Sequence, residues 1–369
     1  MPGTLSFIKQ SFPGKPTFTE EHMPELTDKV AIVTGSNTGL GKEVAQILYA
    51  KGTRVYMMAR NEGNTKSAMS SIRAAVPESS GELIYIPLDL SDFNKVKAAA
   101  DEFLAREQSL HLLINNAGVG YPPKGSRTVQ GWELQLGVNC LGTWLFTQLL
   151  TPTIVATAKM SPPNSVRVAW VSSSAAEAVS PKNFVQGLPA NNQSAANDKY
   201  ENRGSFEAYC LSKLGGYYYA AEYAARHKSD GIVSVSLNPG NLDSDFWREQ
   251  GAMTTCILRK TLLYPPKMGR LHRALRRPVP RGYPGQVWEI YCAMGTVLGG
   301  VAGVSGCDEA EIRERHGRGA GVLEMVRDPA SPVSLKQHGG DPAAIAEPNW
   351  LGFIIPRLLG VVDLLAIFR

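Results

Sequence analysis

Cysteine is scarce in this sequence, and the excess of positive over negative charge is small. Only five of the 369 residues are cysteines, and none of them forms a CxxC pair. An odd number of scattered cysteines supplies neither a disulfide framework nor a zinc-ligand set, so we expect no metal and a reducing, cytoplasmic location. The net charge is only +5. So small an excess is not the electrostatic footprint of a nucleic-acid binder, and we expect no nucleic-acid partner.

Long uninterrupted apolar runs are missing at both ends of the chain. Pro and Gly break up residues 1–27, which predicts an extended N-terminal arm and no secretory signal. Residues 350–369 are apolar, but Pro356, Arg357 and Asp363 interrupt them. Charges inside such a run argue against a membrane-spanning helix, and we expect no membrane contact. An interfacial amphipathic helix is the alternative.

What the sequence does contain is a regular alternation of strand and helix patterns. Short β-branched runs alternate with longer segments of helical periodicity, and 43% of all residues are hydrophobic. The predicted strands are 29–35, 53–60, 82–90, 110–118, 166–175 and 232–240, and the predicted helices are 40–52, 64–78, 93–108, 131–158 and 206–227. This order predicts an α/β fold with a doubly wound parallel sheet, the Rossmann fold, in a single domain over residues 28–268. The polar segment 186–205 predicts a long, functional loop inside it.

The segment TGSNTGLG follows the first predicted strand and opens the first predicted helix. Gly35, Gly39 and Gly41 would permit a tight turn and a close approach of the backbone to a pyrophosphate. Free N–H groups and the helix dipole at the start of the helix favour that negative charge. The segment therefore predicts a dinucleotide site, with an ordinary strand–helix turn as the alternative.

Tyr209 and Lys213 in YCLSK are four residues apart, so a helix places both side chains on one face. A phenol has a pKa of about 10, and a nearby ammonium group favours phenolate and lowers that pKa. Such a phenol can donate a proton to a forming alkoxide or accept one from an alcohol. Taken alone, a Tyr–Lys pair at this spacing is usually an ordinary surface pair.

Three further polar features are weak signals individually. The serines of WVSSSAA end a predicted strand, where a hydroxyl could hydrogen-bond a substrate carbonyl oxygen. NNAG, residues 115–118, ends the fourth strand at the expected cofactor crevice. Asn139 lies inside a predicted helix, where it could kink the helix, hold a water or be an ordinary buried polar residue.

In combination and in this order, the motifs resemble the short-chain dehydrogenase/reductase family over residues 26–246. The family's TGxxxGxG pattern matches residues 34–41, its NNAG pattern residues 115–118 and its PG pair residues 239–240. The Thr usually found just beyond PG is replaced by Ser244, which keeps a hydroxyl. The resemblance, together with the charges discussed below, implies cofactor contacts at Gly35, Ser36, Asn37, Gly39, Leu40, Gly41, Lys42, Arg60, Asp89, Leu90, Asn116, Ala117, Gly118, Tyr209, Lys213, Pro239, Gly240 and Ser244.

The resemblance also implies a catalytic set of Asn139, Ser173, Tyr209 and Lys213, with Ser174 as the alternative serine. In that family, Tyr is the general acid–base, Lys lowers its pKa and binds the nicotinamide ribose, Ser orients the carbonyl, and Asn supports a proton-relay water. Tyr209 lies 36 residues after Ser173. This long spacing resembles the retinol-dehydrogenase-like and WW-domain-oxidoreductase-like branch, with its many fungal members, and implies a bulky apolar carbonyl or alcohol as substrate.

The end of the second predicted strand bears on the choice of cofactor. An acidic residue there would bind the ribose 2′-OH of NAD. The strand instead ends in MARNEGN, with Arg60 and no acid at its tip. A guanidinium group suits a 2′-phosphate, and Lys42 adds a positive charge on the same side. We therefore predict NADP(H), with NAD(H) as the less favoured alternative.

The sequence thus predicts an oxidoreductase that transfers a hydride between NADP(H) and the carbonyl or secondary alcohol of a small, apolar molecule. The alternative is a catalytically silent dinucleotide-binding protein. The partner in either case is a small molecule, and the chain could form a homo-oligomer.

Residues 267–300 depart from the family's pattern. Five arginines and no acidic residue lie between Arg270 and Arg281. Shifting the reading frame by one nucleotide can turn residues 270–280 into AYTELFAGLSP, which looks like the ordinary end of the fungal group. We therefore predict that residues from about 269 onward, the atypical tail 269–369, are translated out of frame. A solvated basic loop and a basic partner-binding arm are the alternatives. An unbroken transcript that encodes residues 270–281 as printed would exclude the frameshift.

Overall fold

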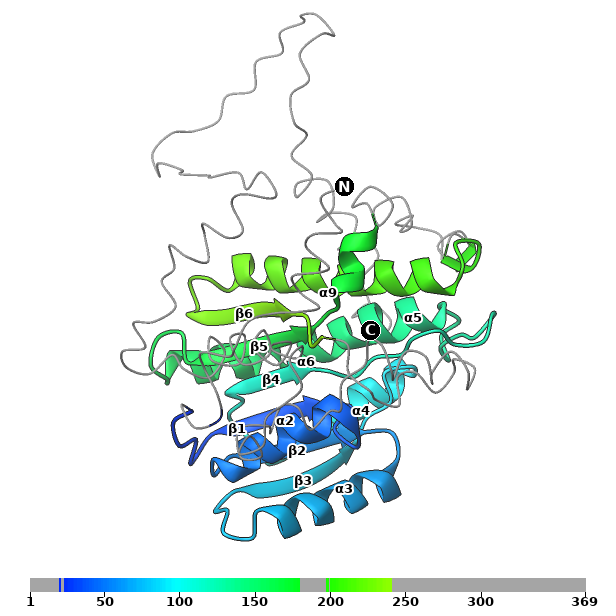
Figure 1. The fold of residues 1–369 in the computed structure, drawn as a ribbon. Helices are drawn as coiled ribbons and strands as arrows, with labels where there is room; N and C mark the ends of the chain where they lie inside the picture. Colours follow the sequence, from blue (N-terminus) through cyan, green and yellow to red (C-terminus); the bar gives the residue numbers. More distant parts are fainter. Residues whose placement is uncertain (1–19, 21–22, 180–196, 199, 241–369) are drawn as a thin grey trace, which may run out of the picture.

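A six-stranded parallel sheet forms the centre of the molecule (Figure 1). The computed structural model describes residues 20, 23–179, 197–198 and 200–240, so most of the predicted arm and the whole predicted tail lie outside the described residues. The strand order is β3-β2-β1-β4-β5-β6, which confirms the predicted doubly wound sheet. The strands are β1 (Val30–Thr34), β2 (Arg54–Ala59), β3 (Glu82–Pro87), β4 (Leu112–Asn115), β5 (Val166–Val171) and β6 (Ile232–Leu237).

The two faces of the sheet are covered by different helices (Figure 1). Side chains of α2 (Gly39–Ala50) and α3 (Glu62–Ala75) pack with Ala31 and Val33 of β1 on one face. Side chains of α4 (Phe93–Arg106), α6 (Thr143–Lys159) and α9 (Ser205–Arg226) pack with Val30 and Ile32 on the other. Every residue of β1 is buried because both faces are covered, which is why all of its residues before Thr34 are apolar.

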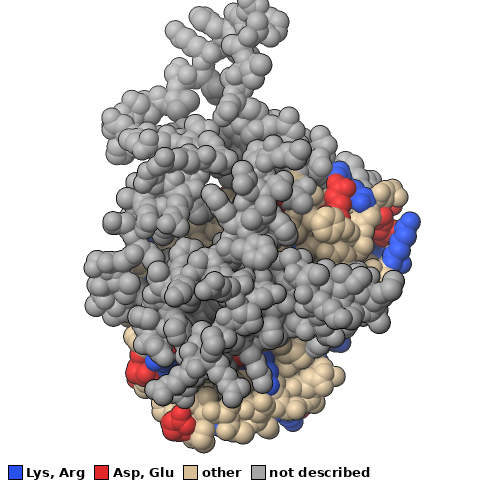
Figure 2. All heavy atoms as spheres, in the orientation of Figure 1, with Lys and Arg blue, Asp and Glu red and all other residues tan. Residues whose placement is uncertain are grey.

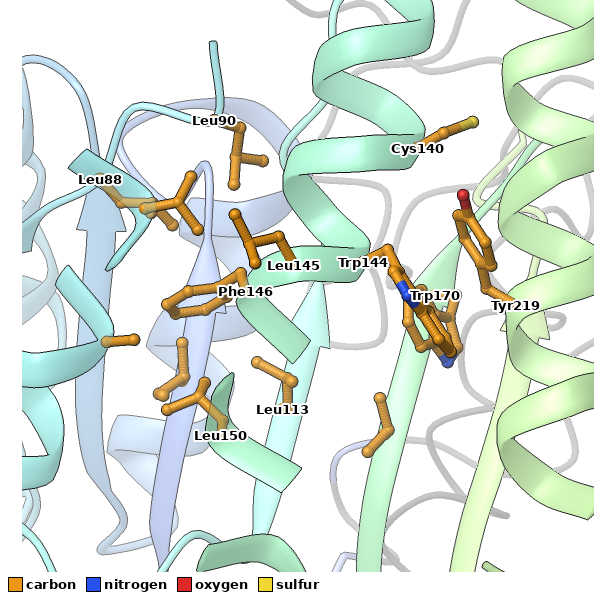
Figure 3. Close-up of a cluster of buried hydrophobic side chains, with 14 of the residues drawn as sticks. Leu88, Leu90, Leu113, Cys140, Trp144, Leu145, Phe146, Leu150, Trp170 and Tyr219 are labelled. Carbon is orange, nitrogen blue, oxygen red and sulfur yellow. The ribbon is translucent and has the colours of Figure 1, made fainter. Parts of the chain in front are cut away.

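An aromatic cluster joins α6 and α9 to strand β5 of the sheet (Figure 3). The ring centroids of Trp144 in α6 and Tyr219 in α9 are 4.8 Å apart, and those of Trp144 and Trp170 in β5 are 6.3 Å apart. All three side chains are buried. Offset stacking at such distances adds to the free energy gained by burial. The cluster therefore fixes α9 against β5, and α9 carries Tyr209 and Lys213.

The helix predicted over residues 131–158 is not uniform. It consists of α5 (Leu134–Leu136), a π-helical turn η2 (Gly137–Gly142) and α6. π-helical turns are rare and occur often at functional sites. Asn139 lies in the middle of this turn, so the predicted irregularity at Asn139 is present as a wider turn and not as a break.

The polar segment predicted as a loop over residues 186–205 is partly helical. Residues 197, 198, 200 and 201 are helical, and Tyr200 is completely buried. The Asn197 side chain accepts a hydrogen bond from Glu133 N (2.7 Å) and donates one to Gly131 O (2.7 Å). The end of this segment is therefore docked against the residues that precede α5. Residues 180–196 lie outside the described part.

Charged side chains of both signs are visible on the described part of the surface in Figure 2. Among the residues that the structure describes, no helix is long and apolar enough to cross a membrane.

Candidate active site

The predicted site residues lie where the parallel strands end. Residues 35–42 follow β1, Arg60 follows β2, residues 89–90 follow β3, residues 116–118 follow β4, and residues 239–240 follow β6. The strand order reverses between β1 and β4. Because the carboxyl ends of parallel strands share one edge, and because ligands bind at the point of reversal in such sheets, this edge is the candidate site.

The turn between β1 and α2 requires its glycines. Gly35 and Gly39 have φ angles of 64° and 54°, in the left-handed region that glycine enters without steric cost. A Cβ atom at Gly41 would overlap the carbonyl oxygen of Gly35, and one at Gly35 would lie 2.9 Å from Ala117 Cα. The backbone is therefore packed too closely here for any larger residue.

The start of α2 suits an anionic group. No side chain caps its first turn, because Thr38 at the N-cap makes no side-chain hydrogen bond, and the first turn contains no acidic residue. Ser36 is completely buried, and its hydroxyl has no hydrogen-bond partner among the described residues. Uncapped N–H groups at a helix N-terminus favour phosphate. The turn therefore fits the pyrophosphate of a dinucleotide, with Asn37 and Leu40 in the same turn.

The glycine turn is held to the NNAG segment by Thr34 and Asn116. The buried Thr34 hydroxyl accepts hydrogen bonds from Asn116 N (3.0 Å) and Ala117 N (2.9 Å). The Asn116 side chain donates to the carbonyl oxygens of Thr34 (2.9 Å) and Gly35 (3.2 Å). Two motifs about 80 residues apart in the chain are thus one hydrogen-bonded unit.

The residues expected around the adenine end are more dispersed. The Lys42 ammonium donates to Ser71 Oγ at 3.0 Å, on the exposed side of α2, and Arg60 is exposed at the end of β2. Asp89 accepts hydrogen bonds from the backbone N and the hydroxyl of Ser91. The Leu90 side chain is part of the core, so any cofactor contact there comes from its backbone.

The expected contacts at the end of β6 are only partly described. Gly240, next to Pro239, has a φ angle of 78°, and its N–H donates to Asn238 Oδ1 at 3.2 Å. Ser244 lies outside the described residues.

Tyr209, Lys213 and Ser173 come together at the end of β5. The Ser173 hydroxyl hydrogen-bonds the Tyr209 phenol, and the Lys213 ammonium lies 5.8 Å from the centroid of the Tyr209 ring. Lys213 Nζ donates to the carbonyl oxygen of Val171 at 3.0 Å. The i, i+4 spacing on α9 therefore places both groups on the face that meets the end of β5, as predicted.

The predicted effect of Lys213 on Tyr209 needs correction. Burial raises the pKa of Tyr209 above its ordinary value, and the hydrogen bond from Ser173 offsets only part of that rise. Burial also lowers the pKa of Lys213 to about 8. Both charged forms are disfavoured because both groups are removed from water. The arrangement therefore keeps Tyr209 protonated at neutral pH.

Asn139 connects three parts of the site. Its Oδ1 accepts a hydrogen bond from Val119 N (2.8 Å), while its Nδ2 donates to Val119 O (2.9 Å) and to Ser212 Oγ (2.9 Å). Gly118 passes so close that an added Cβ would lie 3.1 Å from Asn139 Oδ1 and 3.3 Å from Lys213 Nζ. The Asn139 side chain thus holds the NNAG segment and α9 in place.

Three buried polar residues that the sequence analysis missed complete this framework. Ser172 Oγ donates to Lys213 O (2.7 Å), and Ser212 Oγ donates to Tyr209 O (2.8 Å). Gln135 accepts from Tyr121 N (3.1 Å) and donates to Ser205 O (3.2 Å), which links the segment after NNAG to the start of α9. Ser172 and Ser212 are adjacent to the predicted Ser173 and Lys213, and that adjacency was the available signal. Nothing in the sequence pattern marks Gln135.

The fold, the glycine turn and the Tyr–Lys–Ser arrangement define a dinucleotide-binding oxidoreductase. A family model described as short chain dehydrogenase matches residues 29–185. A short-chain dehydrogenase/reductase of Phomopsis amygdali is 46% identical over 264 residues, covering 70% of this chain and 76% of that protein. The chain belongs to the short-chain dehydrogenase/reductase family, whose members are enzymes that bind a nicotinamide dinucleotide and act on small molecules.

One further relative supports this assignment, and one solved structure shares the fold. Short-chain dehydrogenase/reductase bet4 of Neocamarosporium betae is 46% identical over 267 residues, covering 72% of this chain and 75% of that protein. The solved structure of a short-chain type dehydrogenase/reductase from Mycobacterium marinum is similar in fold, with a TM-score of 0.51 and 18% identity over 68% of this chain and 88% of that one. The predicted resemblance to fungal members is confirmed by these fungal relatives.

Proposed function

We propose that this protein is an NADP(H)-dependent carbonyl reductase or alcohol dehydrogenase in which Tyr209 is the general acid–base. The observation that carries the proposal is the hydrogen bond between Tyr209 and Ser173 beside Lys213, at the carboxyl edge of the sheet. A bound nicotinamide cofactor supplies or accepts the hydride. The residues of this chain position the carbonyl group and move the proton.

The protonation state of Tyr209 suits the donation of a proton when a carbonyl is reduced. Burial raises its pKa, so the phenol holds its proton at neutral pH. A neutral phenol can donate that proton to the alkoxide oxygen that forms when a carbonyl is reduced. Ser173 is placed to donate a second hydrogen bond to the same oxygen, because its hydroxyl already lies at hydrogen-bond distance from the phenol. Lys213 lies close enough to stabilise negative charge as the proton leaves.

Two positive charges support NADP(H) over NAD(H). Arg60 is exposed at the end of β2, at the position where an acidic residue would bind a ribose hydroxyl. Lys42, in the first turn of α2, donates to Ser71 on α3, and it adds a second positive charge next to the glycine turn. A guanidinium group and an ammonium group together suit a 2′-phosphate.

We propose a small apolar ketone or secondary alcohol as the substrate and the cytoplasm as the location. Asn139 holds the backbone of the site in this proposal, with the proton-relay water as its further role. The rival function is dinucleotide binding without catalysis. Asn139, Ser173, Tyr209 and Lys213 are all present. Asn139 hydrogen-bonds Ser212 on α9, and Lys213 on α9 hydrogen-bonds Val171 at the end of β5, which favours the enzyme.

Replacing Tyr209 by Phe distinguishes the two functions. Removing the phenol hydroxyl is expected to reduce the turnover of a panel of ketones with NADPH by about 100- to 10,000-fold. Binding of NADPH, followed by its fluorescence, is expected to stay within a few-fold of wild type. Tyr217→Phe is the matched control, because Tyr217 is an exposed tyrosine on the same helix. If wild type and Tyr209→Phe were equally active, or equally silent while both bound NADPH, the enzyme proposal would be wrong.

A further inference from the structure

Tyr121 has a backbone conformation that its residue type disfavours. Its φ angle is 54°, in the left-handed region that bulky side chains rarely enter. The next residue is Pro122, and a residue before proline is normally confined to extended conformations. A residue held in such a conformation persists only when its surroundings fix it, and such residues cluster at functional sites.

The surroundings that fix Tyr121 are themselves part of the site. Its N–H donates to the side chain of Gln135, which is buried and whose amide donates to Ser205 O. Ser205 is the first residue of α9, four residues before Tyr209. The conformation of Tyr121 is thus coupled to the helix that carries the proposed acid–base.

Tyr121 belongs to a group of three neighbouring aromatic rings. The Tyr121 ring lies 5.3 Å from the Tyr209 ring, with an angle of 33° between the planes. The Phe206 ring is also a neighbour of Tyr121, with centroids 6.5 Å apart and planes only 9° from parallel. Phe206 and Tyr209 are three residues apart on α9, so they share one face of the helix.

The exposure of the Phe206 ring is not explained by core packing. Phe206 has 58% of its surface exposed, so little of the hydrophobic gain from burying it is realised in this chain. Burial raises the pKa of Tyr121 to about 12, so its ring stays uncharged at neutral pH. A substrate held by Tyr209 has to share its site with Tyr121, because their centroids are only 5.3 Å apart.

We propose that Tyr121 and Phe206 form an aromatic shelf that positions the substrate by stacking on a planar, conjugated ring next to its carbonyl group. This inference rests on the proposed function and narrows its substrate class from apolar carbonyls to aryl or otherwise ring-conjugated ketones. Near-parallel rings attract a third planar ring through offset stacking, whereas a saturated ring of equal size gains only from contact area. Tyr121 and Phe206 are therefore positioning residues, and Tyr209 is the group that reacts.

The test compares acetophenone with cyclohexyl methyl ketone, two ketones of nearly equal size that differ in the planarity of the ring. Phe206→Leu keeps an apolar side chain and a good helix former but removes the ring. Its KM for acetophenone is expected to rise about 3- to 10-fold, while its KM for cyclohexyl methyl ketone and both kcat values stay within about 2-fold. Tyr121→Asn, which tolerates the left-handed conformation, is expected to give the same pattern. Phe206→Tyr and Tyr121→Phe keep an aromatic ring and are expected to keep the preference for acetophenone.

Tyr217→Leu is the matched control, because Tyr217 is an exposed aromatic residue on the same helix and is 53% exposed. The shelf would be refuted if wild type showed no preference for acetophenone, or if Phe206→Leu and Tyr121→Asn raised the KM of both ketones equally. Calorimetric binding of the two ketones to the NADPH-loaded Tyr209→Phe variant separates this inference from the proposed function. Tighter binding of acetophenone that Phe206→Leu abolishes would support the shelf even if no ketone were turned over, and equal binding of both ketones would overturn it.

Discussion

Lys213→Met is expected to make the folded protein more stable at neutral pH while abolishing turnover. Lys213 is 8% exposed, and burial lowers its pKa to about 8 from an ordinary 10.5. The folded state therefore disfavours the ammonium form that the unfolded chain carries freely. Methionine has a similar shape and no charge, so the substitution removes this cost together with the group that assists Tyr209.

The magnitude follows from the difference between the two pKa values. Below pH 8 the ammonium is charged in both states, and at 1.36 kcal/mol per pH unit its burial costs about 3 kcal/mol. The cost falls as the pH rises from 8 to 10.5, because the folded state releases its proton first, and it vanishes above 10.5. Between pH 7 and pH 9 the cost of burying the ammonium falls by about 1 kcal/mol. Losing the hydrogen bond to Val171 costs about 1 kcal/mol, so the net gain at pH 7 is about 2 kcal/mol.

Urea unfolding at pH 7 and pH 9, followed by circular dichroism, measures both quantities. The free energy of unfolding of Lys213→Met is expected to exceed that of wild type by about 2 kcal/mol at pH 7. This advantage should shrink by about 1 kcal/mol between pH 7 and pH 9. Lys66→Met is the control, because Lys66 is exposed on α3 and its substitution leaves the pH dependence unchanged. A variant less stable than wild type at pH 7, or an advantage that does not change with pH, would refute the reasoning.

Two further predictions concern the cofactor end of the site. Arg60→Asp is expected to lower the affinity for NADPH relative to NADH by about 10- to 100-fold, because a charge-assisted hydrogen bond is lost and an acidic group is added. Fluorescence titration with both cofactors measures the two affinities. An unchanged ratio of these affinities would exclude Arg60 from the 2′-phosphate site. Thr34→Val leaves the N–H groups of Asn116 and Ala117 without their acceptor and is expected to lower the free energy of unfolding by about 2–4 kcal/mol. Thr34→Ser keeps the hydroxyl and should be near wild type in the same urea experiment, and equal losses in both variants would contradict the role of the hydroxyl.

The sheet and the motifs could be predicted from the sequence because their signals are local. The run VAIVT of β1 is buried on both faces, and its first four residues are therefore apolar. The glycines of the β1–α2 turn are required by backbone geometry, which a single segment of sequence expresses. The i, i+4 spacing of Tyr209 and Lys213 fixes their common face once the segment is known to be helical.

The features that escaped prediction depend on distant parts of the chain. The pKa of Tyr209 is set by burial, which the spacing to Lys213 does not express. The helical residues 197, 198, 200 and 201 are too few to show a period. Their position depends on hydrogen bonds of the Asn197 side chain to residues 64 to 66 positions away. The Gln135 bridge spans 14 residues on one side and 70 on the other. Such contacts exist only after the sheet has formed.

The hydrogen bonds of Thr34 also couple cofactor binding to folding. Thr34 and Asn116 become neighbours only when β1 and β4 pair, so the phosphate turn has its packed shape only in a chain whose central strands are assembled. A dinucleotide that recognises this shape binds the folded state and not the unfolded one, and by mass action it shifts the folding equilibrium by about 2.7 kcal/mol at 100 times its dissociation constant. The cofactor concentration around the protein would then help to set how long each molecule survives proteolysis, independently of any substrate.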